Sequence, residues 1–282
     1  MEKGGSEMKR LAGIRVIGML AALAAVLALI QGLGGYLVSE LTQFETTAPE
    51  VGSPAETQTP AVIHRQTLRL ETMAYNTLQI GTFTDLAKGQ HIIDELAEEG
   101  YRVFVTPSEP YHLWVGCFAV PEGMQNIPEV IQAKGEDIYV TKALLNETVL
   151  SFDEDQLFFK EHLVPLLEKS DIVLKHSLKM FQTADYQAYD DALWQQQIQR
   201  LQEEIEHVHS FTEEVLLEAD AQPLAKPLAD FQVLLEEYSQ SLTIITEKKN
   251  DQAVLLAQSY LLELISQYHQ LIEDANSCSS GL

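Results

Sequence analysis

The sequence is poor in cysteine and in basic residues, and both shortages exclude classes of protein. Cys117 and Cys278 are its only cysteines, and they have neither the number nor the spacing of a disulfide scaffold or a zinc site. A bridge between the two remains open. Acidic side chains outnumber basic ones 42 to 18, and the formal net charge is −24. This charge repels polyanions, so no nucleic acid is expected as a partner.

Motifs of catalysis are also missing. The chain contains no Gly-x-Ser-x-Gly, no His-Glu-x-x-His and no phosphate-binding loop. Glu204 to His207 spells Glu-x-x-His, which is half of the motif of di-metal helical bundles. Glu206 to His209 only overlaps it and Glu109 to His112 lies at a predicted turn, so no second helix supplies the other half. His207 and His209 point to different faces of a helix and make a poor ligand pair. We therefore predict that the chain is not an enzyme and holds no metal or other cofactor. An amidase is the enzyme considered as an alternative, but this sequence has no set of zinc ligands for it.

One long run carries no charge at all. Residues 16–38, VIGMLAALAAVLALIQGLGGYLV, are 23 residues long, which as a helix is enough to cross ~30 Å of hydrocarbon. Four basic residues precede the run, and Glu40 and Glu45 follow it, which places the N-terminus in the cytoplasm. The sequence thus predicts a cytoplasmic tail (1–15), a transmembrane helix (16–38) and an extracytoplasmic remainder, anchored in the cell membrane as a single-pass protein. The alternative is a cleaved signal peptide, but the run is longer than usual for one.

Residues 39–65 contain much Thr, Pro, Glu and Ser and few bulky apolar side chains. This composition predicts a disordered linker. With the dimensions of a random coil, such a linker holds the following domain about 25–30 Å from the bilayer on average.

Residues 66–145 carry the pattern of a small α/β domain. Alternating or β-branched segments predict strands at 73–81, 101–105, 111–119 and 137–144. Helices are predicted from the cap at Asp85 through Glu99, with Gly100 as terminator, and over 127–133. The order is βαββαβ, the RNP-like arrangement in which both helices cover one face of the sheet and leave the other open.

The open face is where a ligand would bind. Leu113, Val115 and Cys117 should point inward, whereas strand alternation assigns another set to the open face. This set comprises Tyr75, Thr77, Gln79, Arg102, Phe104, His112, Trp114, Phe118 and Tyr139. Aromatic groups among neutral polar ones suit a glycan, whose rings pack on aromatics. The alternative is that the C-terminal helices cover this face and simply bury it.

At this point the residues resemble a known family. The segments QIGTFTD (79–85), EEGY (98–101) and YHLWVGCF (111–118) are similar, in order and spacing, to the SPOR (sporulation-related repeat) domain. The resemblance covers about residues 70–144. It implies a peptidoglycan-binding module that prefers denuded glycan strands, those stripped of their stem peptides, as found at division septa. The layout of the whole chain also loosely resembles the stage II sporulation protein B type.

The resemblance implies which residues contact the glycan. Gln79 and Thr82 occupy first-strand positions implicated in this contact, and His112 stands where an Arg is usual. Trp114 replaces a small or polar residue and adds a stacking surface. With Tyr75 and Phe104 from the open face, these residues form the predicted glycan-binding set. By contrast, Phe83 and Phe118 are predicted to be packing anchors. Gly81 and Gly116 are predicted to permit either close backbone approach or a bend at the strand end.

The rest of the chain is predicted to be helical. Between residues 153 and 280 there is no Gly, and four segments fit helices: 153–182, 185–219, 224–248 and 251–275. Apolar stripes on the second and fourth predict an antiparallel α-helical bundle over residues 150–276, followed by a tail (277–282). The complete fold class is thus α+β. Residues 150–282 hold 24 acidic and 8 basic side chains, which favours a cationic partner.

Two hypotheses of function follow. The first is a noncatalytic, membrane-anchored protein that binds peptidoglycan at the division or sporulation septum, with a protein partner at the bundle. The second is a regulatory or scaffolding subunit whose helical bundle controls a cell-wall hydrolase or a signalling partner.

Overall fold

The computed structural model describes residues 65–119, 127–181, 190–219 and 223–280. All of them belong to one compact unit, Ala61–Leu282, of mixed α+β class. The predicted cytoplasmic tail, the transmembrane helix and the linker up to residue 64 lie outside the described residues. Within the described ranges, no helix combines the length and the hydropathy that crossing a membrane requires.

The central sheet has the expected order of elements. In chain order these are β2 (Met73–Phe83), α2 (Leu86–Glu98), β3 (Phe104–Val105), β4 (Tyr111–Phe118), α3 (Glu129–Lys134) and β5 (Tyr139–Leu145). The strands lie in the order β3-β4-β2-β5 with antiparallel pairs throughout. The carboxylate of Asp85 caps α2 by accepting from the amide of Ala87, and Gly100 ends this segment at φ +81°. The predicted βαββαβ order is therefore confirmed.

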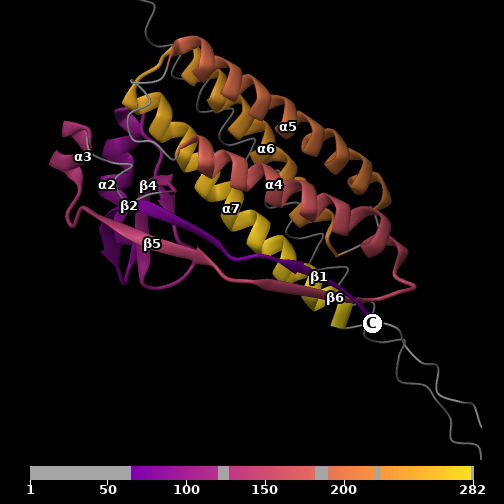
Figure 1. Ribbon diagram of the computed structural model, residues 1–282. Coiled ribbons are helices and arrows are strands. Elements are labelled where there is room, and N and C mark those ends of the chain that lie inside the picture. Colours follow the sequence, from indigo (N-terminus) through magenta and orange to yellow (C-terminus); the bar gives the residue numbers. More distant parts are fainter. Residues whose placement is uncertain (1–64, 120–126, 182–189, 220–222, 281–282) are drawn as a thin grey trace, which may run out of the picture. The chain divides into compact units, whose positions relative to one another are not determined.

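A second, two-stranded sheet was not expected. β1 (Arg65–Leu70) pairs antiparallel with β6 (Thr148–Asp153), and Figure 1 shows this ribbon beside the bundle. Alternate side chains are buried, namely Leu68, Leu70, Leu150 and Phe152. The helix expected from residue 153 consequently begins later, because period-2 burial over 148–153 makes this segment a strand.

Four long helices follow, and consecutive ones lie side by side (Figure 1). They are α4 (Val164–Met180), preceded by the π-helical turn η2 (Phe159–Leu163), α5 (Asp191–Glu218), α6 (Ala225–Glu247) and α7 (Asp251–Ser280). The stripe predicted on α5 is buried: Trp194, Ile198, Leu201, Ile205, Val208, Thr212 and Val215. The antiparallel bundle is thus present, but α7 continues through most of the segment expected to be a tail.

One helix, α7, joins the bundle to the sheet. A single core cluster contains Tyr75, Phe104 and Cys117 from the sheet together with the buried residues of all four bundle helices. A second cluster, which includes Leu78, Ile92 and Ile131, lies between the sheet and the pair α2 and α3. The sheet is therefore covered on both faces, and the alternative that C-terminal helices bury the open face holds over much of its area.

A β-bulge corrects the assignment of two residues. Between the pairs Thr77–Cys117 and Gln79–Trp114, β2 advances by two residues while β4 advances by three. The extra residue reverses the alternation beyond it. Cys117 therefore packs in the core shared with the bundle, and Phe118 packs against α2 and α3, which is the reverse of the expected orientation. Phe118 is still a packing anchor, as predicted.

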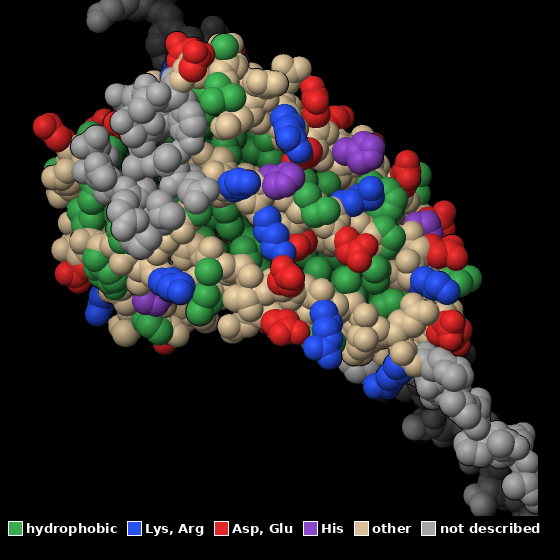
Figure 2. Space-filling model, viewed as in Figure 1, with side chains coloured by type: hydrophobic (Ala, Val, Ile, Leu, Met, Phe, Trp, Pro, Cys, Tyr) green, Lys and Arg blue, Asp and Glu red, His purple; other side chains and the backbone are tan. Residues whose placement is uncertain are grey.

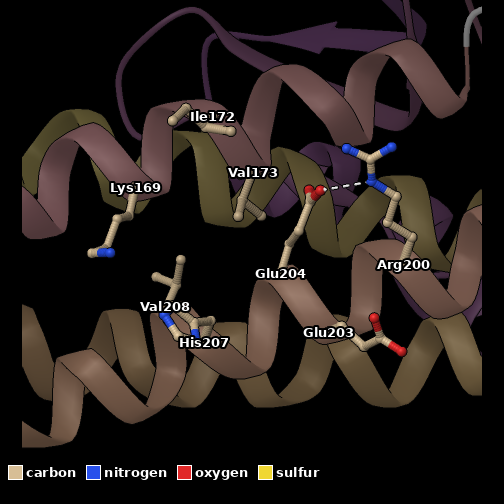
Figure 3. Close-up of a pocket in the computed structure, with 8 residues that line it drawn as sticks. All are labelled: Lys169, Ile172, Val173, Arg200, Glu203, Glu204, His207 and Val208. Carbon is tan, nitrogen blue, oxygen red and sulfur yellow. Dashed lines mark hydrogen bonds and ion pairs between the residues drawn. The ribbon is translucent and has the colours of Figure 1, made fainter.

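The carboxylate of Glu204, in the half-motif, is engaged by neighbouring side chains. It accepts a hydrogen bond from Nε of Arg200 at 3.1 Å and contacts Nδ1 of His176 at 2.7 Å. Figure 3 shows the side chain of His207 directed away from this carboxylate. No group of three metal-ligating side chains occurs among the described residues, and Cys117 and Cys278 are both free thiols.

The surface of the bundle is not uniformly acidic. Figure 2 shows Lys, Arg and His side chains gathered around exposed apolar ones on one face of the molecule. This face includes the line along which α4 and α5 meet, where Lys169, Lys179 and Arg200 lie.

Candidate functional site

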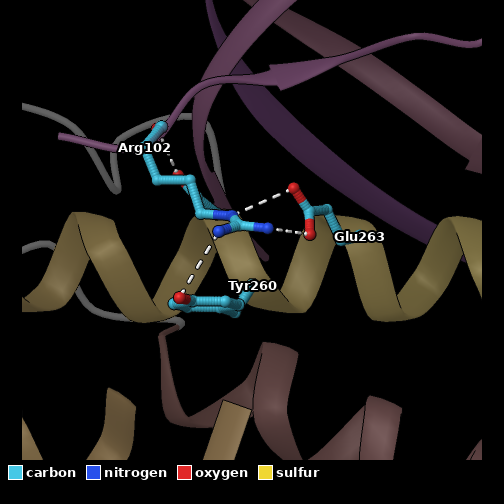
Figure 4. A network of polar contacts seen from close by, with 4 residues as sticks. Arg102, Tyr260 and Glu263 are labelled. Atoms are coloured by element: carbon cyan, nitrogen blue, oxygen red, sulfur yellow. Dashed lines mark hydrogen bonds and ion pairs between the residues drawn. The ribbon is translucent and has the colours of Figure 1, made fainter. Parts of the chain in front are cut away.

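The part of the sheet under α7 is held by polar contacts as well as by apolar packing. The guanidinium of Arg102 donates from Nη2 and Nε to the carboxylate of Glu263 at 2.6 and 3.0 Å, and it lies 4.3 Å from the ring centre of Tyr260 (Figure 4). Oγ of Ser259 donates to the carbonyls of Arg102 and Val115. Because these contacts join two distant parts of the chain, they fix α7 over β3 and β4.

The charge of Arg102 is stabilised in this interface. Burial alone lowers the pKa of its guanidinium, but the hydrogen bonds and the charge of Glu263 outweigh burial, so the pKa is raised. Arg102 therefore stays a cation, and it faces a carboxylate of α7 rather than a ligand.

Gly116 permits the close approach of α7. A Cβ at this position would lie 2.6 Å from Oε1 of Gln258 and 2.8 Å from Cδ2 of Leu255. The predicted close approach at Gly116 is therefore present, since a side chain here would displace the ends of these two side chains of α7.

Two members of the predicted glycan-binding set are buried in the core. Tyr75 and Phe104 are each only 8% exposed and belong to the core shared with the bundle. Burial raises the pKa of the Tyr75 phenol well above its ordinary value, so the group is neutral. The expectation that these two rings are displayed on an open face is wrong, because both are buried in the core that the sheet shares with the helical bundle.

The other four predicted residues come together around the paired residues Gln79 and Trp114, next to Phe104 and away from Tyr75. Gln79 on β2 is paired with Trp114 on β4 and with Tyr139 on β5, while Trp114 is paired with Phe104 on β3. One cross-strand row thus spans all four strands. Residues facing each other in such a row have side chains within reach of one another, so the register itself assembles the site.

Gln79 is the centre of the polar contacts in this row. Its Nε2 donates to Oγ1 of Thr82 at 2.6 Å and to the hydroxyl of Tyr139, and its Oε1 accepts from Nε1 of Trp114 at 3.3 Å. Oγ1 of Thr82 also lies 3.3 Å from Nδ1 of His112. The amide of Gln79 is 1% exposed, yet both its donor and its acceptor are satisfied.

The outer groups of the network remain accessible. Thr82 is exposed, His112 and Trp114 are half-buried, and the ring of Tyr139 is 46% exposed. The indole of Trp114 lies between Phe104, at 5.7 Å, and the imidazole of His112, at 6.3 Å between ring centres. We call the set Gln79, Thr82, His112, Trp114 and Tyr139 the Gln79 cluster. It offers ring faces and hydroxyl groups around one fixed amide.

Tyr139 was expected on the open face but was not included in the predicted binding set. Its importance comes from the pairing of β5 with β2, which places it directly opposite Gln79. Alternation along β5 predicts the face of the sheet on which Tyr139 lies. Only the pairing register shows that it lies opposite Gln79.

No protein-family model, curated protein or solved structure matches this chain significantly. The resemblance to the SPOR domain accordingly stays a prediction that rests on the residues themselves.

Proposed function

We propose that this chain is a noncatalytic, membrane-anchored protein that binds peptidoglycan, with a preference for denuded glycan strands at the division or sporulation septum. The observation that carries the proposal is the Gln79 cluster. It joins two accessible rings and two accessible polar side chains to a buried amide on the part of the sheet that α7 leaves uncovered.

The chemistry of the cluster suits a glycan. The rings of Trp114 and Tyr139 offer apolar faces on which a sugar ring packs, and the hydroxyl of Thr82 and the imidazole of His112 can exchange hydrogen bonds with sugar hydroxyls. The contacts of Gln79 with its neighbours hold these groups in place before the ligand arrives, which lowers the entropic cost of binding.

The cover of α7 limits the extent of the site. Since Tyr75 and Phe104 are buried in the core shared with the bundle, the accessible groups span β4, β2 and β5 at one end of the sheet only. A short stretch of glycan is therefore the expected ligand. The preference for denuded strands is what the resemblance to the SPOR domain implies.

The proposed anchor and linker place the cluster at the wall. A transmembrane helix over residues 16–38 with the N-terminus in the cytoplasm, followed by a flexible linker, would hold the sheet outside the membrane within reach of peptidoglycan.

Cosedimentation of the full chain with purified sacculi tests this function. We expect amidase treatment, which removes stem peptides, to increase binding. The double variant Thr82→Ala with His112→Ala should bind about tenfold more weakly, because it removes two polar contacts worth roughly 0.5–1.5 kcal/mol each. The control, Thr243→Ala with His269→Ala, changes the same residue types on α6 and α7. Equal binding of both double variants would contradict the proposal.

A further inference from the structure

A groove runs between α4 and α5, far along the chain from the Gln79 cluster. It consists of two hollows of about 390 and 360 Å³ that share Arg200 and Glu204. Figure 3 shows the larger one, with Lys169, Ile172 and Val173 on one helix facing residues of the other.

The groove is built from two stripes at helical spacing. On α4 the stripe is Lys169, Ile172, His176 and Lys179, at steps of 3, 4 and 3; on α5 it is Gln197, Arg200, Glu204 and His207, at the same steps of 3, 4 and 3. Such spacing keeps all members of a stripe on one face of the helix. The groove therefore follows the helices over about 15 Å, the rise of α4 from Lys169 to Lys179.

The floor of the groove is apolar. Val173 and Val208 lie at its base and are each 2% exposed, whereas Ile172 on the rim is 52% exposed. An isoleucine that projects into solvent beside such a floor gives an incoming apolar side chain a surface to pack on.

The rim of the groove carries cations without carboxylate partners. Nζ of Lys169 lies 5.5 Å from the ring centre of Phe211, and neither Lys169 nor Lys179 has an acidic side chain within ion-pair distance in the described part of the chain. Arg200 shares Glu204 with His176, so this carboxylate is already engaged. On a chain with a net charge of −24, the groove is a local exception, because Lys169, Lys179 and Arg200 outnumber the two carboxylates of its lining, Glu203 and Glu204.

We propose that the groove between α4 and α5 docks an acidic amphipathic helix of a partner protein. The apolar face of that helix packs on Ile172 and the valine floor, and its carboxylates meet Lys169 at one end and Lys179 at the other. An apolar groove with charged ends is the surface that recognises a helix through anchors at i, i+4 and i+7. The average charge of the bundle favours a cationic partner, but at this groove the complementary charge is negative.

The experiment uses the full-length chain in lipid nanodiscs and a fluorescent synthetic peptide of about four turns. The peptide carries Leu at i, i+4, i+7 and i+11 and Glu on the flanking positions. Fluorescence anisotropy should show saturable binding of this peptide. A scrambled peptide of the same composition and a peptide with Lys in place of Glu should not bind, and empty nanodiscs serve as the blank.

Variants locate the binding site. Lys169→Glu with Lys179→Glu should weaken peptide binding about tenfold, and Ile172→Glu should do the same, because these residues lie on the rim or are exposed. The control Lys88→Glu with Lys226→Glu introduces the same change of charge on α2 and α6 and should stay within about twofold of the wild type. Thermal unfolding measured alongside confirms that each variant is folded.

Three outcomes would overturn the proposal. They are the absence of binding by the acidic peptide, equal binding of the scrambled peptide, which would mean attraction by charge alone, and equal loss in the groove and control variants. None of these outcomes bears on binding to sacculi, so the docking proposal can fail while the glycan site stands.

Discussion

Replacing Trp114 with alanine is expected to weaken the binding of the full chain to amidase-treated sacculi by about thirtyfold. A central aromatic contact is typically worth about 2 kcal/mol, which corresponds to this factor. The indole is the ring next to the fixed amide, and its removal also leaves Oε1 of Gln79 without the donor at 3.3 Å. Cosedimentation over a range of sacculus concentrations measures the affinity.

Two further variants make the Trp114 result specific. Trp114→Phe keeps a ring face but loses the indole donor, so its affinity should fall between those of the wild type and Trp114→Ala. Phe158→Ala removes an aromatic side chain that is also half-buried but lies next to η2, outside the site. If Phe158→Ala weakens binding as much as Trp114→Ala, the loss reflects general destabilisation and the Gln79 cluster is not the contact.

Replacing Leu264 with alanine is expected to reduce the free energy of unfolding by about 2–5 kcal/mol, the usual cost of truncating a fully buried leucine. Leu264 lies on α7, is 0% exposed, and belongs to the core cluster that joins the sheet to the bundle. Because this core is shared, the loss should appear in both parts of the unit. The exposed Leu217, also helical, is the control, and Leu217→Ala should cost less than about 0.5 kcal/mol.

The two tryptophans report on the two parts separately. Trp114 lies on the sheet and Trp194 on α5, so the variants Trp194→Phe and Trp114→Phe each leave one probe. In urea unfolding followed by fluorescence, both probes should give the same midpoint, and Leu264→Ala should lower both midpoints together. A shift in the Trp194 transition alone would contradict a shared core.

Much of the fold could be predicted from local patterns. The cap at Asp85, the glycine at position 100 and the apolar stripe of α5 each specify their element without reference to the rest of the chain. These signals are local because hydrogen bonds and burial within one helix follow from residues a few positions apart.

Long-range packing could not be predicted in the same way. The burial of Tyr75 depends on the helical bundle, which follows much later in the chain. The ribbon of β1 and β6 depends on the pairing of two segments that are each too short to be distinctive. The bulge in β4 leaves no distinctive signal in the sequence either, yet it reverses the orientation of Cys117 and Phe118. Counting alternate residues along a strand predicts the face of each side chain only up to the first bulge or register shift.

The predicted site residues show the same difference between local patterns and long-range packing. Gln79, Thr82, His112 and Trp114 lie on adjacent paired residues of β2 and β4. Strict alternation would put Gln79 and Thr82, three positions apart, on opposite faces, and the register shift between Gln79 and Gly81 is what allows their contact. Tyr75 and Phe104 were placed on the correct face, but the helix that covers this face is specified elsewhere in the chain.

The central claim is that the uncovered end of the sheet, around Gln79, contacts the glycan. The most direct test is an NMR titration of the compact unit 61–282, labelled with ¹⁵N at the tryptophan indoles, with denuded glycan oligosaccharides. Two indole signals are expected, since the chain has two tryptophans. We predict that the signal of Trp114 shifts in a saturable manner while that of Trp194, buried in the bundle, does not. An unchanged Trp114 signal at saturating oligosaccharide would contradict the claim.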